Sequence, residues 1–466
     1  MTDDSLSIGF YELPGPSTRS RKELATLRRA GVTIGCVAPP RWSQRLEDWG
    51  LERIPARVGG GHRLRGDLER RIRTVDVSTS AGRRQQKLWQ SVLDQPTPQI
   101  ARRPADLNIL AYEWVAAAEA LSSWPAHIYW AADLDALPAV VWAAQSRPGS
   151  RVVYDAHELF MRLEYLDVGQ LGDWEAIARD FIPQVDLTLT VCTGIADILA
   201  REYGARRVEV VANLAAPATG TRPRLRDMLG LRPDDPLAVH VGNVVPNRRP
   251  ELAIHLLARE PRLHVAFVGE VRQDTDRMIL DLARSHGVSD RLHIIDPVPL
   301  DELTSFLVGT DLSLILYSPR TSPNLLLAMP NKLYDSLAAG VAVVATEGTA
   351  AGDFVSRERV GRTFVDGSAE ALAGAVRDLL DDNGLRTELA ARREEFAWPT
   401  AEPFLVDRVT ALGHSALETV IEPLPSGTAP THGPAAPAPS WSRHPLVRGR
   451  KAAAWRLRRL SRWLEP

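Results

Sequence analysis

The chain has 466 residues, enough for two or three domains at about 150 residues each. Its 56 lysines and arginines nearly balance 58 aspartates and glutamates, so the net charge of −2 gives no bias towards nucleic acid. No run of about 18 apolar residues predicts a transmembrane helix, and the acidic N-terminus lacks a signal-peptide pattern. The two cysteines favour buried reduced thiols over a disulfide or metal site, and we expect a cytoplasmic protein.

The N-terminal half opens with a strand, a helix and a second strand, predicted over 6–11, 18–30 and 32–38. This βαβ order implies a parallel sheet, in which ligands bind beyond the carboxyl ends of the strands. The loop after the first strand is therefore expected on the acceptor side of a cleft, and its candidate residues are Gly15, Ser17 and Arg19. Arg19 is interpreted either as a ligand for an anionic group or as a solvated helix charge.

Residues 40–103 are rich in Arg, Gln and Gly, and form either an acceptor-side element or a variable insertion. Further on, Asp133 and Asp135 lie between a predicted strand and an apolar helix. We expect one of them to cap that helix, because a lone pair of carboxylates is weak evidence for a metal site.

The stretch RVVYDAHELF places polar residues at the end of another predicted strand. His157 and Glu158 come directly after this strand, where chemistry is expected in a parallel sheet. A strand, a helix over 193–203 that Thr193 is expected to cap, and a further strand complete this half up to Asn213. A linker rich in Pro, Gly and Thr follows over 216–223 and predicts a hinge.

The C-terminal half begins near Leu225, and its first predicted strand runs into a loop with Gly242, Asn243, Arg248 and Arg249. A glycine turn and basic residues before a helix start predict a phosphate-binding site, because free backbone N–H groups and positive charge favour an anion. The alternative is a surface pair of basic residues.

A second phosphate site is predicted in AMPNKLYDSLAAGVAVVAT, where Asn331 and Lys332 lead into a helix that stops at Gly340 before an apolar strand. Lys332 is expected to supply a mobile positive charge beside the helix N-terminus. Asp335 lies near the first turn, where its carboxylate can accept two hydroxyl hydrogen bonds. A phosphate site beside an acceptor for a diol predicts a nucleotide sugar.

These stretches resemble the donor loops and active-site loop of family 4 glycosyltransferases, which are retaining enzymes with the GT-B fold. The Pro-Asn-Lys loop is similar to that of one subgroup. The resemblance implies an α/β protein of two Rossmann-like domains that face a cleft, with a C-terminal crossover helix. We predict an N-terminal acceptor domain over 1–215, to which residues 396–420 return, and a donor domain over 224–395.

The resemblance also implies roles for individual residues. His157 is expected to contact the transferred sugar, while Glu158 orients His157 or binds the acceptor. Arg248 and Lys332 are expected to hold the donor diphosphate, which makes a metal unnecessary. Asp335 takes the place of a family glutamate that binds the ribose.

Three positions depart from the family pattern. Leu327 stands where the family often has a glutamate that contacts the donor sugar, and Asn324 is the expected substitute. Asn243 replaces an arginine, and Arg249 replaces a glycine and is interpreted as supplying the missing charge. These changes leave the donor sugar open.

We therefore predict a metal-independent, retaining hexosyltransferase without a cofactor. The donor is a UDP or GDP sugar, and the acceptor is a saccharide, a lipid-linked group or a small molecule, as in polysaccharide, glycolipid or glycoconjugate synthesis. The alternatives are a GT-B-related nucleotide-sugar epimerase or phosphorylase, and a non-catalytic nucleotide-sugar-binding protein.

The C-terminal end differs from the rest in composition. Residues 421–442 are rich in Pro and Ala and predict an extended linker, and 443–466 form a basic segment with helical apolar spacing. Such a helix either contacts the inner face of an anionic membrane or docks on protein, and a membrane scaffold is a third hypothesis for function.

Overall fold

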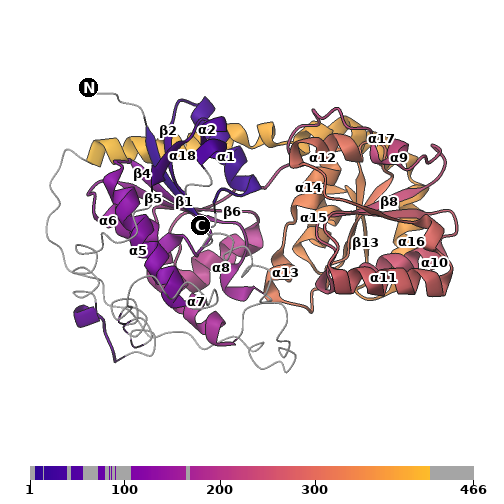
Figure 1. The fold of residues 1–466 in the computed structure, drawn as a ribbon, viewed down its shortest axis with the longest axis horizontal. Coiled ribbons are helices and arrows are strands. Elements are labelled where there is room, and N and C mark those ends of the chain that lie inside the picture. The colour runs from indigo at the N-terminus through magenta and orange to yellow at the C-terminus, as the bar shows by residue number, and fades with distance from the viewer. Residues whose placement is uncertain are drawn as a thin grey trace.

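The computed structural model describes residues 6–13, 15–38, 43–55, 72–78, 83, 86, 90, 107–163 and 168–419. These residues form two parallel β-sheets with helices packed around them, which lie side by side (Figure 1). The predictions for the linker 421–442, the basic tail 443–466 and most of 40–103 fall outside the described residues. Within the described part of the chain, no helix has the length and apolar character needed to cross a membrane.

The N-terminal sheet has the strand order β3-β2-β1-β4-β5-β6-β7, and every neighbouring pair is parallel. Its strands are β1 (Ser7–Glu12), β2 (Thr33–Ala38), β3 (Glu52–Pro55), β4 (Ile128–Ala132), β5 (Arg151–Ala156), β6 (Leu187–Thr190) and β7 (Val208–Val210). Its helices are α1 (Thr18–Arg29), α2 (Ser43–Asp48), α5 (Leu107–Ser123), α6 (Leu137–Gln145), α7 (Val168–Phe181) and α8 (Thr193–Tyr203). Strand β4 is buried throughout, as expected of an apolar strand covered on both faces.

The C-terminal sheet has the order β10-β9-β8-β11-β12-β13 and is also parallel. Its strands are β8 (Leu237–Val241), β9 (His264–Val268), β10 (Leu292–Ile295), β11 (Leu312–Ile315), β12 (Ala342–Thr346) and β13 (Gly361–Phe364). Its helices are α9 (Leu225–Met228), α10 (Pro250–Arg259), α11 (Gln273–His286), α12 (Leu300–Leu307), α13 (Pro323–Leu327), α14 (Asn331–Ala338), α15 (Ala350–Glu358), α16 (Ala369–Leu380) and α17 (Asn383–Arg392).

The chain crosses between the two sheets twice, and the crossings are paired with each other. The amide of Ala215 donates to the carbonyl of Phe396 at 3.0 Å, and the amide of Trp398 donates to the carbonyl of Ala215 at 2.7 Å. After the second crossing, α18 (Glu402–Thr419) packs against α1 and β5 of the N-terminal domain, as Figure 1 shows. The predicted crossover helix is therefore confirmed, with Trp398 and Pro399 in a short 3-10 turn before it.

Two predicted helix caps are wrong. Ala136 is the N-cap of α6 and makes no side-chain cap, because Asp133 turns towards the next strand's loop instead. Cys192 is the N-cap of α8, which leaves Thr193 as its first helical residue. Helix α14 begins at Asn331, so Asn331 and Lys332 belong to its first turn rather than to the preceding loop.

Candidate active site

Strand order brings four loops to the places where ligands bind in parallel sheets. In the C-terminal sheet β8 lies between β9 and β11, and in the N-terminal sheet β1 lies between β2 and β4. At such switch points the loops at the carboxyl ends of adjacent strands diverge and leave space for a ligand. Most of the predicted site residues lie on or near these loops. The others lie on the loop after β5 and in the first turn of α14.

The loop after β8 begins at a glycine that is required by backbone geometry. Gly242 has φ of +91° and Gly269 has φ of +146°, values that other residues rarely adopt. A Cβ on Gly269 would lie 2.4 Å from the carbonyl oxygen of Gly242, so the two loops touch through bare backbone. A Cβ on Gly242 would lie 4.0 Å from Cε of Lys332, so the lysine side chain runs past the start of this loop.

Three basic side chains gather beside Gly242. Lys332 of α14 is buried, and its Nζ lies 3.0 Å from Nε2 of the fully buried His240 on β8. The guanidinium carbon of Arg248 lies 4.1 Å from the centre of the Tyr317 ring, and Nζ of Lys332 lies 5.6 Å from it. Nη1 of Arg248 is buried without a hydrogen-bond partner among the described residues. A cluster of cations without a paired carboxylate is suited to an anion.

The electrostatics of this cluster follow from burial. Burial first, and then the charge of Arg248, lower the pKa of Lys332 well below its ordinary value, against a smaller opposing effect of Asp335. Burial and the charges of Lys332 and Arg248 lower the pKa of His240 as well. The structure therefore shows Lys332 as a buried group with a partner, and not as the mobile charge that was predicted.

Arg249, which was expected to supply a missing charge, is engaged by carboxylates. Its φ is +54°, and its guanidinium is directed to carboxylates: Nε donates to Glu251 at 2.5 Å and Nη1 to Asp366 at 3.4 Å. Two acidic partners balance its positive charge, and a role for Arg249 in compensating for Asn243 stays a prediction. Asn243 itself is exposed in the same loop.

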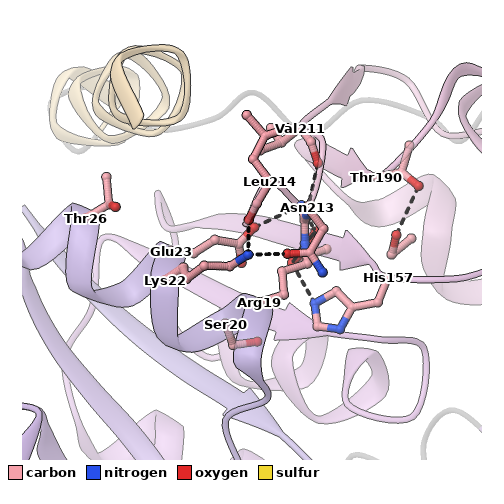
Figure 2. Close-up of polar contacts among 12 residues, drawn as sticks. Arg19, Ser20, Lys22, Glu23, Thr26, His157, Thr190, Val211, Asn213 and Leu214 are labelled. Carbon is pink, nitrogen blue, oxygen red and sulfur yellow. Dashed lines mark hydrogen bonds and ion pairs between the residues drawn. The ribbon is translucent and has the colours of Figure 1, made fainter. Parts of the chain in front are cut away.

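The first turn of α14 meets the N-terminal domain through a polar network. Nζ of Lys22 donates to Oδ1 of Asn213 at 2.7 Å and to the carbonyl of Leu214, and Nδ2 of Asn213 donates to Oδ1 of Asn331 at 2.6 Å. Burial raises the pKa of Asp335 to about 7, although Lys22 and Lys332 favour its ionised form. Figure 2 shows Lys22 directed at Asn213 and Leu214, beside Arg19 and His157.

His157 is held between two carboxylates at the end of β5. Its Nε2 lies 2.8 Å from Asp155, and its Nδ1 lies 3.6 Å from Asp133. Burial favours the neutral ring, but the two carboxylates outweigh it and raise the pKa of His157 to about 10. The carboxylate of Asp133 also accepts a hydrogen bond from the backbone amide of His157 at 3.1 Å. The backbone of Asp133 itself has φ of +65°. Such backbone strain is often found at functional sites.

Arg19 lies behind His157 and does not face a ligand. Its guanidinium donates to Asp155 at 2.9 Å, pairs with Glu23 at 2.9 Å and donates to the carbonyl of Val211 at 2.8 Å. The side chain is 2% exposed, so both earlier interpretations, a ligand for an anion and a solvated helix charge, are wrong. Figure 2 shows Arg19 and Glu23 reaching from α1 towards the residues around His157.

The rest of the first loop serves the start of α1. Ser17 is the N-cap of α1, and its hydroxyl accepts from the amide of Ser20 at 3.3 Å. The amide of Ser17 in turn donates to Glu12 at 2.8 Å, and Gly15 has φ of +147°. These contacts give Gly15 and Ser17 local structural roles and do not test a role in acceptor binding.

Asn324 and Glu158 meet across the two domains. Oδ1 of Asn324 accepts from the amide of Leu159 at 3.0 Å, and Nδ2 of Asn324 donates to Glu158 at 3.4 Å. Glu158 was predicted to orient His157, but the residues that contact the imidazole ring directly are Asp155 and Asp133. Asn324 is 5% exposed, and its amide is engaged by the N-terminal domain.

Leu327, at the position of the missing glutamate, packs against the N-terminal domain. A Cβ on Gly194 would lie 2.8 Å from Cδ2 of Leu327, and Sγ of Cys192 donates to the carbonyl of Leu327 at 3.4 Å. An apolar contact between domains thus replaces a carboxylate at this position.

Glu23, Asp155 and His157 offer ligand atoms that lie within 4.8 Å of one another, a spacing compatible with a metal ion. The guanidinium of Arg19 already contacts Asp155 and Glu23 and supplies the positive charge there. A metal ion at this place would have to displace that guanidinium.

Comparison with known proteins gives a family match for part of this architecture. Residues 221–396 match the model of the family "Glycosyl transferases group 1". The chain is 29% identical over 290 residues to the D-inositol 3-phosphate glycosyltransferase of Rhodococcus jostii, covering 56% of this chain and 61% of the relative. It is 26% identical over 233 residues to the lipopolysaccharide core biosynthesis glycosyltransferase LpsE of Rhizobium meliloti, covering 49% and 63%. The chain thus spans about three fifths of these relatives.

Solved structures resemble nearly the whole described fold. HepE of Anabaena, solved with UDP and glucose, gives a TM-score of 0.58 at 15% identity, covering 87% of this chain and all (100%) of that one. Sucrose-phosphate synthase of Thermosynechococcus elongatus gives a TM-score of 0.61 at 14% identity, covering 88% and 100%. The predicted fold of two Rossmann-like domains, as in GT-B glycosyltransferases, is confirmed, and the C-terminal domain carries the glycosyltransferase group 1 match.

Sequence reasoning missed three residues at this site. His240 lies inside an apolar strand, where a lone histidine gives no sign of a partner in α14. Lys22 is one of many basic residues in α1, and Asp133 was assigned to a helix cap. Of these three residues, only Asp133 could have been predicted from the sequence, because it is a polar residue at the end of a strand, like Asp155.

Proposed function

We propose that this chain is a glycosyltransferase that moves a sugar from a nucleoside-diphosphate sugar to an acceptor hydroxyl. The observation that carries the proposal is the cluster of Arg248, Lys332 and His240 at the switch point of the C-terminal sheet, where no described carboxylate is paired with either cation. A diphosphate supplies the missing negative charge, and the first-turn N–H groups of α14 add to its stabilisation, since Pro330 gives them no side-chain cap.

We propose for this site the front-face course that the family resemblance implies. The bond between the sugar's anomeric carbon and the diphosphate oxygen breaks, and the acceptor oxygen forms the new bond on the same face of the sugar. The acceptor proton passes to the leaving phosphate oxygen, while Arg248 and Lys332 stabilise the charge that develops there. This front-face course gives retention and needs neither a metal nor a dedicated protein base.

His157 supports this assignment of the proton. Both ring nitrogens face carboxylates, so the ring is a poor proton acceptor and acts instead as a cation beside the reacting sugar. Asp335 is proposed to accept hydrogen bonds from the ribose. The charge of Lys22 in the N-terminal domain favours the ionised form of Asp335.

The relatives' names guide the acceptor class. One relative is named a D-inositol 3-phosphate glycosyltransferase and another a glycosyltransferase of lipopolysaccharide core biosynthesis. We therefore propose a saccharide, lipid-linked or small-molecule acceptor, used in the cytoplasm. The basic tail 443–466 is proposed to hold the enzyme at an anionic membrane surface. Deleting 421–466 is expected to abolish sedimentation with phosphatidylglycerol vesicles and to spare donor binding.

The proposal is tested with a thermal-shift screen of UDP, GDP and their sugars, followed by transfer assays over an acceptor panel. Arg248→Ala and Lys332→Ala are expected to weaken nucleotide binding, while Arg201→Ala, on an exposed ion pair, is the matched control. Binding with equal strength by all four proteins would refute the site assignment.

The same assays separate two alternatives. One structural neighbour is a putative UDP-N-acetylglucosamine 2-epimerase of Listeria monocytogenes, with a TM-score of 0.52 at 12% identity. Conversion of the nucleotide sugar without an acceptor would indicate an epimerase, and a phosphorylase would consume phosphate. Donor binding without turnover over the whole panel would indicate a binding protein.

A further inference from the structure

The contact between Lys332 and His240 has a defined direction. Nζ of Lys332 lies 3.0 Å from Nε2 of His240, and a charged ammonium has no lone pair, so when Lys332 is protonated its Nζ is the donor and Nε2 the acceptor. Nε2 can accept only when the imidazole is neutral. His240 is fully buried on β8, and its ring packs against Phe267 with ring centres 5.7 Å apart, so it is held in place by the core.

The surroundings leave Lys332 without another strong partner. The charged groups that face it are Arg248, which repels it, and Asp335, which lies about one turn further along α14 and also feels the charge of Lys22. The ring of Tyr317 lies 5.6 Å away and is already covered by Arg248 at 4.1 Å. A buried ammonium beside a second cation is costly to keep charged unless it is hydrogen-bonded.

We propose that His240 is a positioning residue of the donor site. Its neutral imidazole accepts a hydrogen bond from Lys332, keeps this lysine protonated, and holds its Nζ beside Gly242, where the donor diphosphate binds. This inference deepens the proposed function and rests on it. His240 acts only through Lys332 and touches no substrate.

The proposal predicts how diphosphate binding responds to pH. Lys332 loses its proton as pH rises through its lowered pKa, and binding of UDP or GDP weakens above that point. Without the acceptor at position 240 the charged form is disfavoured further, so the loss of affinity begins at lower pH. His240→Leu removes the acceptor with little change in volume, whereas His240→Gln keeps an amide oxygen near the place of Nε2.

The experiment measures the Kd of the nucleoside diphosphate by calorimetry from pH 6 to 9.5, on the full chain. We expect the alkaline limb of His240→Leu to move down by about one pH unit, which gives about tenfold weaker binding at a pH above the wild-type midpoint. His240→Gln should follow the wild type. In a Lys332→Ala background, His240→Leu should cause no further change in the pH dependence.

Superimposable pH profiles for wild type and His240→Leu would overturn the inference, and so would an equal shift in the Lys332→Ala background. If His240→Leu does not fold, His240→Asn replaces it, because the shorter amide cannot reach Nζ and should shift the limb while His240→Gln does not. A wild-type protein that binds no nucleoside diphosphate at any pH would instead refute the proposed function.

Discussion

Asn324 accepts a hydrogen bond from the amide of Leu159 at 3.0 Å, and so joins helix α13 of the C-terminal domain to the loop that carries His157. Its amide nitrogen reaches Glu158 at 3.4 Å in the same loop. The residue that the sequence offered as a substitute sugar ligand is used to align the two halves of the site.

This alignment can be tested by charge. Asn324→Asp keeps an acceptor for Leu159 but places a carboxylate against Glu158, and Asn324→Ala removes both contacts. We expect kcat to fall about tenfold in each, equivalent to about 1.4 kcal/mol, with the Kd of the nucleotide nearly unchanged. Adding Glu158→Gln to Asn324→Asp should bring kcat back to that of the Glu158→Gln single variant. Adding Glu158→Gln to Asn324→Ala should not restore kcat. Equal rescue of both would contradict the proposed contact.

His157 gives a pH-dependent prediction. Its pKa is raised from 6.5 to about 10, so the folded protein binds this proton more tightly than the unfolded chain. The resulting stability is present below pH 6.5 and is lost as pH rises through about 10. The difference in thermal midpoint between wild type and His157→Gln should therefore shrink from pH 7 to pH 10.

The control is His127→Gln, because burial lowers the pKa of His127 and no such trend is expected for it over that range. Asp133→Asn should lower the pKa of His157 in an NMR titration. An imidazole signal from His157 that titrates near its ordinary pKa in the wild type would contradict the two-carboxylate arrangement.

Arg19 is expected to matter for stability more than for binding. Arg19→Met leaves the buried carboxylates of Asp155 and Glu23 without their partner, which we expect to cost about 3 to 5 kcal/mol in denaturant unfolding. Arg201→Met breaks an exposed pair with Asp197 and should cost less than about 1 kcal/mol. Similar losses in both variants would show that Arg19 is not the buried centre of this cluster.

Gly242 tests the shape of the phosphate loop. Its φ of +91° strains any other residue, so Gly242→Ala should lower the free energy of unfolding by about 1 to 2 kcal/mol and weaken diphosphate binding. Gly374→Ala is the matched control, since Gly374 lies inside helix α16 and its added Cβ meets nothing within 4 Å. This control should gain about 0.5 to 1 kcal/mol. A neutral Gly242→Ala variant would contradict the backbone geometry.

Local patterns were sufficient for much of the fold. Apolar runs bounded by glycine predicted strands such as 341–345, which the structure has at Ala342–Thr346. Their alternation with helices predicted parallel sheets, and the family resemblance implied a returning C-terminal helix. Position after a strand also identified His157 and the Gly242 loop, because in parallel sheets the carboxyl ends of the strands share an edge.

Side-chain partners were beyond reach of the sequence, because they depend on which distant elements face each other. The chain by itself determined two Rossmann-like units and the loops at their edges. Only the tertiary structure decided that Arg19 is buried beneath His157, that Asp366 lies beside Arg249, and that Nζ of Lys332 lies 3.0 Å from Nε2 of His240. Each of these pairings is set by packing between elements, and burial then fixes how strongly the charges interact.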